Sequence, residues 1–298
     1  MSTYSGILRH DEPLARYTTW RVGGPARQLY RPTDIADLTA FLRELPPAEP
    51  LLWLGLGSNV LIADSGFAGT VIHTLGGLTG LEQRGATGIV VDAGVPSAKL
   101  ARFAAQHNLC GLEFLTGIPG TFGGALALNA GAWGGETWPH VRRVQTLDRH
   151  GTLRQRDAAE FSVGYRQVSG AAGEWFVAAE LELTPGDGAA AMERMREMLE
   201  RRAATQPIGQ PSCGSVFRNP PNDHAARLID ALGLKGYRIG GAQVSEKHAN
   251  FIINTGSATA ADISHLIDYV QQQVAQHTGI HLIPEVHQIT GHSDDNHA

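Results

Sequence analysis

The chain has 298 residues, of which 42% are hydrophobic and 18% charged, so it can bury a sizeable core in two or three compact units. A net charge of −5 argues against broad nucleic-acid binding, so an anionic ligand would have to be held in a pocket. Its apolar runs are far shorter than the ~20 residues of a membrane helix, and no apolar signal core begins the chain, which indicates a cytoplasmic protein without membrane insertion. The spacing of Cys110 and Cys213 fits neither a disulfide framework nor a zinc site, so no metal is expected.

Short strands and single helices are predicted for the first part of the chain. Thr33 can cap a helix in which three apolar residues recur at helical spacing, namely Ile35, Leu38 and Leu42. Strands are expected at 51–56, 70–74 and 88–94. A second helix then has Leu100, Phe103 and Ala104 on one face. The mixture indicates an α+β or α/β fold.

Further strands and one long helix are predicted for the middle of the chain. Residues 141–155 have the pattern of a hairpin that turns at His150 and Gly151, and another strand is expected at 174–183. The helix that follows has Met192, Met195 and Leu199 on one stripe. Because residues 206–215 resemble a linker, we place a domain boundary near residue 205.

The last part is predicted to form a smaller domain. Its first helix has four apolar residues on one face and stops at Gly233; they are Ala225, Leu228, Ile229 and Leu232. After a strand at 250–254, Thr259 and Asp262 form a capping-box-like start to a final helix. A strand at 284–290 closes the domain, and the polar tail beyond it is expected to fray.

Two glycine-rich loops stand out as candidate ligand sites. The first, after residue 54, contains Gly-x-Gly but lacks the third glycine and the following helix of a dinucleotide-binding fold, so it could equally be a turn that uses Gly55 and Gly57 for unusual dihedral angles. A second such loop, Gly117 to Gly124, favours a ligand, because successive backbone N–H groups make a concavity suited to pyrophosphate oxygens. One large cofactor could bind both loops.

Eight segments stand in the order found in UDP-N-acetylenolpyruvoylglucosamine reductases, and over residues 18 to 290 the chain is similar to that family. They are TTWRVGGPA, LGLGSNVLIAD, AGVP, GLEFLTGIPGTFGGALALNAGA, GYR, CGSVFRNP, LKGYRIGGAQVS and PEV. The resemblance implies an α+β fold: an FAD-binding region of the vanillyl-alcohol-oxidase type in two subdomains, followed by a C-terminal α/β substrate domain. We expect these units at 1–75, 76–204 and 205–298.

The resemblance also implies a cofactor and a reaction. NADPH would reduce a noncovalently bound FAD, which would then pass hydride to the enolpyruvyl group of a UDP-sugar. Residues of the two glycine-rich loops resemble the family's FAD cradle; they are Gly55, Gly57, Ser58, Asn59, Gly117, Gly120, Gly123 and Gly124. Hydride delivery to the methylene carbon leaves enolate-like charge next to the substrate carboxylate, and a cation must stabilise that charge.

Three residues match the family's catalytic positions. Arg166 resembles the arginine that holds the substrate carboxylate, Ser215 resembles the proton donor, and Glu285 resembles the carboxyl group that assists the arginine as a protonated acid. Taken without the family, Arg166 would more often belong to a surface ion pair, Ser215 to a turn, and Glu285 to a solvated loop. Because eight family segments occur in order, the resemblance favours the catalytic roles over these structural ones.

Four further residues are expected to contact substrate, namely Tyr165, Arg218, Asn219 and His248. Without the resemblance they would be strand, turn and solvated residues. The chain departs from the family at His287, where an arginine is usual, and it resembles the shorter family branch, which lacks an inserted tyrosine loop between Arg166 and Ser215. The oligomeric state stays open.

Two alternatives use the same cofactor loops. An oxidase of alcohols or sugars from the same FAD-binding superfamily is one, although many such oxidases attach flavin covalently and the loops here suggest no attachment residue. A flavin-binding regulatory module without chemistry is the other. The C-terminal segments oppose the oxidase, and the joint presence of the three catalytic matches opposes the regulatory module.

Overall fold

A four-stranded mixed sheet forms the first part of the computed structural model, which describes residues 3–290. In spatial order its strands are β1 (Ile7–Pro13), β2 (Pro25–Arg31), β5 (Phe67–His73) and β3 (Leu51–Leu54). β5 is parallel to both β2 and β3. Helix α1 (Ile35–Glu44) is capped by Asp34, whose side chain accepts from the Asp37 N–H. The prediction that Thr33 caps this helix was therefore wrong by one residue.

The second part is built on a five-stranded antiparallel sheet. In spatial order its strands are β12 (Leu153–Asp157), β11 (Val141–Asp148), β15 (Glu174–Glu182), β7 (Gly88–Asp92) and β6 (Leu81–Arg84). This arrangement confirms the predicted hairpin. Helix α2 (Ser97–Gln106) and the short α3 (Phe122–Ala127) pack their apolar residues into the core beside this sheet. The small hairpins β9–β10 (Gly131–Ala132, Gly135–Glu136) and β13–β14 (Ser162–Gly164, Gln167–Ser169) lie outside it.

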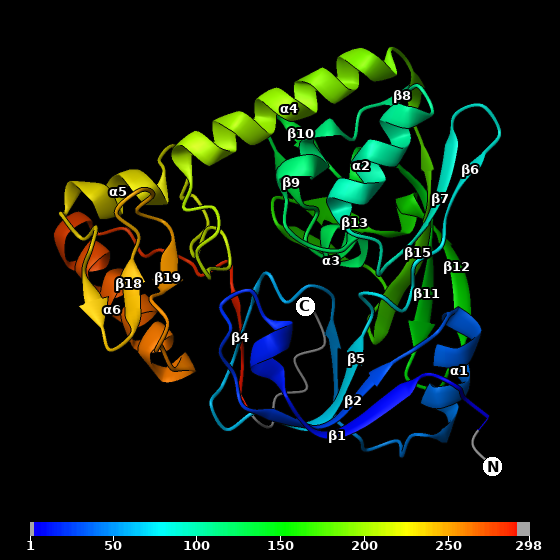
Figure 1. Ribbon diagram of the computed structural model, residues 1–298, viewed down its shortest axis with the longest axis horizontal. Helices are drawn as coiled ribbons and strands as arrows, with labels where there is room; N and C mark the ends of the chain where they lie inside the picture. The colour runs from blue at the N-terminus through cyan, green and yellow to red at the C-terminus, as the bar shows by residue number, and fades with distance from the viewer. Residues whose placement is uncertain (1–2, 291–298) are drawn as a thin grey trace.

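The long helix α4 (Gly188–Thr205) runs from the second part to the C-terminal part (Figure 1). Its predicted apolar stripe is only partly buried: Met195 is buried, whereas Met192 and Leu199 are 40% and 42% exposed. Within this helix, Ala191 and Met195 make the contact with the core.

The C-terminal part contains two helices and a three-stranded antiparallel sheet. Its elements are α5 (Ala225–Ala231), β17 (Arg238–Ile239), β18 (Ala242–Val244), β19 (Ile252–Asn254) and α6 (Ala260–Thr278). The predicted capping box is confirmed, because the side chains of Thr259 and Asp262 each accept a backbone N–H of the other residue. Gly279 ends α6 in a left-handed conformation at φ 72°.

The first and C-terminal parts share one core. Trp20 is fully buried among the apolar residues of the C-terminal part, and its indole N–H donates to the Ile252 carbonyl at 2.7 Å. The Asn254 side chain returns a hydrogen bond to the Trp20 carbonyl at 2.9 Å. The two parts are therefore held together by buried apolar surface and by paired polar groups.

The chain also returns to the first part after α6. Strand β20 (His287–Ile289) pairs in parallel with β4 (Val60–Ile62). Asp64, just after β4, accepts from the N–H groups of Ala260 and Ala261 at the start of α6. These contacts place the segment before β20 against the first glycine-rich loop.

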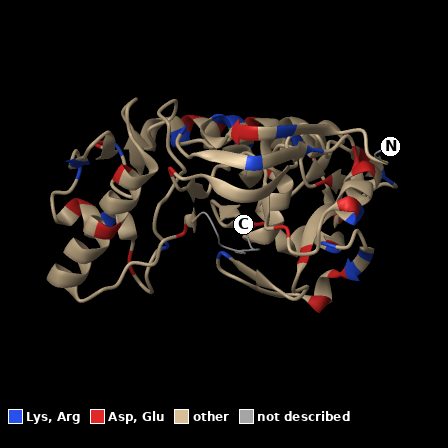
Figure 2. Ribbon diagram, turned by 90° about the horizontal axis from the view of Figure 1, so that it is seen from below, with Lys and Arg blue, Asp and Glu red and all other residues tan. Residues whose placement is uncertain are grey.

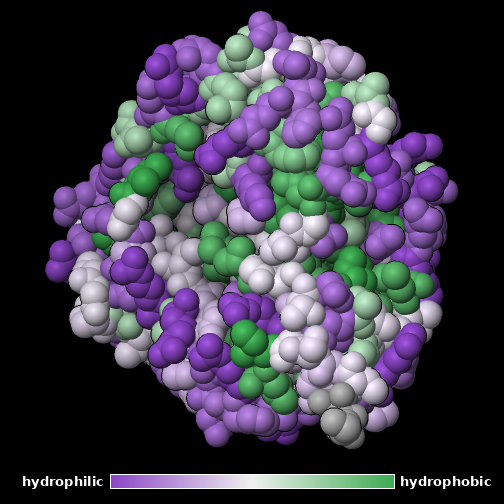
Figure 3. All heavy atoms as spheres, turned by 45° about the vertical axis from the view of Figure 1, so that its right-hand side comes forward, coloured by the Kyte–Doolittle hydropathy of each residue, from purple (hydrophilic) through white to green (hydrophobic). Residues whose placement is uncertain are grey.

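Charged residues of both signs are spread over all three parts (Figure 2). On one face, apolar residues form several separate groups among hydrophilic ones (Figure 3). Within residues 3–290 no helix is both long enough and apolar enough to cross a membrane. The predicted polar tail lies outside the described residues.

Candidate active site

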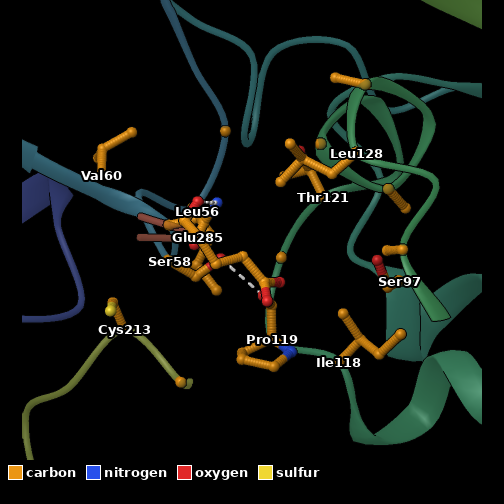
Figure 4. Close-up of a pocket in the computed structure, with 18 of the residues that line it drawn as sticks. Leu56, Ser58, Val60, Ser97, Ile118, Pro119, Thr121, Leu128, Cys213 and Glu285 are labelled. Carbon is orange, nitrogen blue, oxygen red and sulfur yellow. Dashed lines mark hydrogen bonds between the residues drawn. The ribbon is translucent and has the colours of Figure 1, made fainter. Parts of the chain in front are cut away.

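A cavity of about 370 Å³ lies where the three parts meet. Its lining includes all eight predicted cofactor-binding residues, the three predicted catalytic residues, Tyr165 and Asn219. A volume of this size is typical of a ligand site. The close-up shows lining residues from the first loop, the second loop and the segment around Cys213 facing one another (Figure 4).

The two glycine-rich loops are in direct contact. The Ser58 hydroxyl donates to the Pro119 carbonyl at 2.6 Å, which is drawn as a dashed line in Figure 4. A Cβ on Gly55 would collide with the Thr121 side chain, and Gly57 has φ 66°, where a Cβ would collide with the Tyr17 carbonyl. These two glycines are therefore required for loop packing and backbone conformation.

Within the second loop the glycines divide into two kinds. A Cβ on Gly124 would meet nothing within 4 Å, and one on Gly120 would approach only the Ser58 hydroxyl, at 3.4 Å. A Cβ on Gly123 would instead lie 2.8 Å from the Ala93 Cβ. A side chain at position 123 would therefore press on the protein, whereas one at position 124 would enter open space.

The loops fit a flavin nucleotide. Within residues 3–290 the N–H groups of Gly57, Ser58 and Gly120 donate to no backbone carbonyl. The short helix α3 starts at the cavity with no side-chain cap. Free N–H groups beside open space are the donors that a pyrophosphate requires.

Arg166 occupies the tip of the β13–β14 hairpin. Its φ of 56° is left-handed, an uncommon conformation for a residue with a side chain, and such outliers concentrate at functional sites. The guanidinium donates through Nε to Glu285 Oε1 at 2.9 Å and through Nη2 to the Gly131 carbonyl at 2.7 Å. Two segments distant in sequence thus fix its direction.

Glu285 is mostly buried, with 16% of its side chain exposed. Burial raises its pKa above the ordinary value, while the charges of Arg166 and Arg218 and the Arg166 hydrogen bond oppose that rise. The net direction is upward, so the carboxyl group keeps a proton to a higher pH than a solvated glutamate. A neutral Glu285 can donate a hydrogen bond to an anionic substrate group.

Ser215 is held beside Glu285 by backbone pairing. The Glu285 N–H donates to the Val216 carbonyl at 2.7 Å, and the Arg218 N–H donates to the Ile283 carbonyl at 2.9 Å. Gly214, immediately before Ser215, has φ 80° and open space at its Cβ position. The half-buried Ser215 therefore lines the cavity from a segment that is fixed to the segment carrying Glu285.

Asn59 and Tyr165 occupy the cavity wall in different ways. The Asn59 side-chain amide donates to the Glu285 carbonyl at 3.0 Å, and the Asn59 carbonyl accepts from the His287 N–H. The amide nitrogen thus connects the cofactor loop to Glu285. Tyr165 is 51% exposed, and its ring lies 5.1 Å from the Arg166 guanidinium carbon.

The other predicted substrate contacts are not all at the cavity. Asn219 lines it and also accepts from the Ala225 N–H at the start of α5. Arg218 and His248 are outside the lining residues. The His248 ring packs edge-on against Phe251, which does line the cavity, and burial lowers the His248 pKa, as does the Lys235 charge.

Two asparagines with positioning roles were not predicted from the sequence. Asn129 is buried at φ 40°, and its side chain donates to Glu136 and to the Gly164 carbonyl. Asn250 both accepts from and donates to the Phe217 backbone. The only available signal was a polar residue within an apolar segment, which does not identify a distant partner.

Comparison with known proteins decides the family. A model described as UDP-N-acetylenolpyruvoylglucosamine reductase, C-terminal domain, matches residues 206–289, and an FAD binding domain model matches residues 26–156. The enzyme of that name from Alkalilimnicola ehrlichii is 62% identical over 95% of this chain and 94% of its own length. The one from Methylococcus capsulatus is 61% identical over 94% and 92%. The chain belongs to the UDP-N-acetylenolpyruvoylglucosamine reductase family.

A solved structure agrees with this family assignment. The UDP-N-acetylenolpyruvylglucosamine reductase of Thermus caldophilus superposes with a TM-score of 0.83 at 33% identity, covering 96% of this chain and 99% of the other. Membership in the reductase family accounts for both the paired glycine-rich loops and the C-terminal part, and it confirms the predicted FAD-binding fold.

Proposed function

We propose that this protein is the NADPH-dependent flavoenzyme that reduces UDP-N-acetylglucosamine enolpyruvate to UDP-N-acetylmuramate, a precursor of peptidoglycan. The observation that carries the proposal is the convergence of Arg166, Ser215 and Glu285 on the cavity formed by the two glycine-rich loops. FAD, when bound, supplies hydride transfer in both directions, from the nicotinamide and to the substrate. Substrate binding and proton delivery depend on side chains of the protein.

Arg166 and Glu285 would together hold the substrate carboxylate. An arginine presents paired donors to a carboxylate, and two of its nitrogens are already oriented by Glu285 and by the Gly131 carbonyl. A protonated Glu285 would donate a second hydrogen bond to the same group. Both contacts strengthen as enolate-like charge develops, so they lower the barrier and not only the binding free energy.

Ser215 would deliver the proton that completes the reduction. Its hydroxyl is a weak acid, so donation requires neighbours that stabilise the alkoxide, and the Arg166 charge at the same cavity would do so. The loop pairing with Glu285 keeps this hydroxyl fixed relative to the carboxyl group. Tyr165 and Asn219 are proposed substrate contacts, and Arg218 would act on the substrate through Glu285, whose pKa its charge lowers.

We further propose the unit boundaries 1–75, 76–204 and 205–298, with the last unit binding the UDP-sugar, and a cytoplasmic location. The test of function is direct. The purified protein should be yellow, release free FAD on denaturation, and oxidise NADPH faster when UDP-N-acetylglucosamine enolpyruvate is added. A colourless protein that takes up no added FAD would refute the flavin role. A flavoprotein indifferent to this substrate would refute the reaction.

A further inference from the structure

An unusual turn lies between the flavin loop and Arg166. In the β9–β10 hairpin the two turn residues, Trp133 and Gly134, have φ values of 50° and 83°. A two-residue turn with both φ values positive is strongly favoured by Asn-Gly or Gly-Gly. A bulky aromatic residue at φ 50° is a true outlier, and such outliers persist only where other contacts require them.

The indole of Trp133 supplies such a contact. Its ring lies against Gly117 in the second glycine-rich loop, so closely that a Cβ on Gly117 would overlap the ring carbons. Gly117 itself lines the cavity. Trp133 is nevertheless 39% exposed, so it adds little to the hydrophobic core. The ring therefore covers the flavin loop from outside the cavity.

The same hairpin also contacts Arg166. The Gly131 carbonyl accepts from Arg166 Nη2 at 2.7 Å, and the adjacent Asn129 side chain ties the hairpin strand residue Glu136 to the Gly164 carbonyl. One short hairpin thus meets the flavin loop through its tip and the guanidinium through its first strand. A shift of the tip would move both.

We infer that Trp133 is a positioning residue for flavin binding: its ring clamps Gly117 so that the loop keeps the shape that receives the cofactor. The inference rests on FAD binding in this cavity, which the wild-type flavin content tests separately. The inference explains why a tryptophan occupies this left-handed turn position. Asparagine would suit the turn better, but its side chain could not cover the loop.

The decisive variant is Trp133→Asn. It should keep or raise the melting temperature of the apoprotein, because asparagine suits the left-handed turn. It should release FAD about tenfold faster on dilution, followed by the fluorescence of free flavin, because the clamp is lost. Trp133→Phe, which retains a ring, should fall between wild type and the asparagine variant. The matched control is Tyr237→Ala, which removes an equally exposed aromatic residue, 39% exposed, from the C-terminal part and should leave FAD release unchanged.

A double substitution tests the contact itself. Gly117→Ala alone should loosen FAD, because its methyl group collides with the indole. Combined with Trp133→Asn, the alanine should add no further loss, because the methyl group then has room. Additive effects of the two changes would overturn the inference. So would wild-type FAD retention in Trp133→Asn, or a fall in apoprotein stability that accounts for the flavin loss.

Discussion

Arg166 and Glu285, which are 119 residues apart in sequence, meet at the cavity, where Arg166 Nε donates to Glu285 Oε1 at 2.9 Å. The pair is asymmetric, because Arg166 has further partners in two backbone carbonyls whereas the mostly buried Glu285 carboxyl group lines the cavity. The difference explains why the pKa of Glu285 is raised by burial despite an adjacent guanidinium.

Replacing Glu285 by glutamine should change how stability depends on pH. A carboxyl group whose pKa is raised in the folded state stabilises the fold below its ordinary pKa and loses that contribution as pH rises through the folded value. We therefore expect the urea-unfolding free energy of wild type to fall relative to that of Glu285→Gln as the pH rises above 4.5, the ordinary pKa of a glutamate. A difference that stays constant with pH would contradict the raised pKa.

Arg166→Lys should impair the substrate half-reaction although the charge is kept. An ammonium group cannot reproduce the planar contacts to Glu285 Oε1 and the Gly131 carbonyl while also presenting paired donors to substrate. Loss of charged hydrogen bonds predicts a drop of about 10–100-fold in the rate of flavin reoxidation by substrate. Stopped-flow absorbance measures it, and near-normal turnover would assign Arg166 to structure.

Ser215→Ala should separate the two half-reactions. Flavin bleaching by NADPH should keep its wild-type rate, because no proton is delivered to substrate carbon in that step. Reoxidation by the enolpyruvyl substrate should slow by ~10²–10⁴-fold, the range typical of a lost general acid.

A cysteine provides the matched variant at the same position. Its thiol has a lower intrinsic pKa than a hydroxyl, so Ser215→Cys should fall between wild type and alanine in the second half-reaction. Equal slowing of both half-reactions in the alanine variant would indicate a collapsed segment around Gly214, whereas unimpaired reoxidation would remove Ser215 from the mechanism.

Valine at Gly124 and at Gly123 should have different consequences. A valine side chain at position 124 would enter open space at the cavity. Gly124→Val should therefore lower FAD occupancy with little change in apoprotein stability. Gly123→Val would press on Ala93 and should destabilise the protein by about 1–3 kcal/mol, the range for overpacking. Flavin content and thermal unfolding of both variants distinguish the two outcomes, and identical behaviour would refute the distinction.

Local features were the most predictable from sequence. The capping box of Thr259 and Asp262 involves residues three apart, so it depends on no distant contact. The cap of α1 was misplaced because Thr33 and Asp34 are both competent, and only the backbone turn selects Asp34. The substrate contact expected of His248 stays a prediction. Its ring packs on Phe251, and the residue is outside the cavity lining.

Long-range relationships could not be predicted in the same way. The bond from the Asn59 amide to the Glu285 carbonyl joins residues 226 apart, and no pattern near Asn59 names its partner. Gly124 borders open space, whereas Gly123 packs against Ala93. This difference depends on which residues the fold places beside each glycine. Ordered family segments identified the chemistry, whereas the contacts that orient it came from the tertiary structure.

The burial of Trp20 in the C-terminal core has a consequence for any attempt to divide the protein. A fragment starting at residue 205 would lack this indole and would leave the Ile252 carbonyl and the Asn254 amide without their partners. Its last strand would also lose β4. Such a fragment should fail to fold alone, yet recover structure when residues 1–204 are supplied as a separate chain, because the missing side chain and strand belong to that piece.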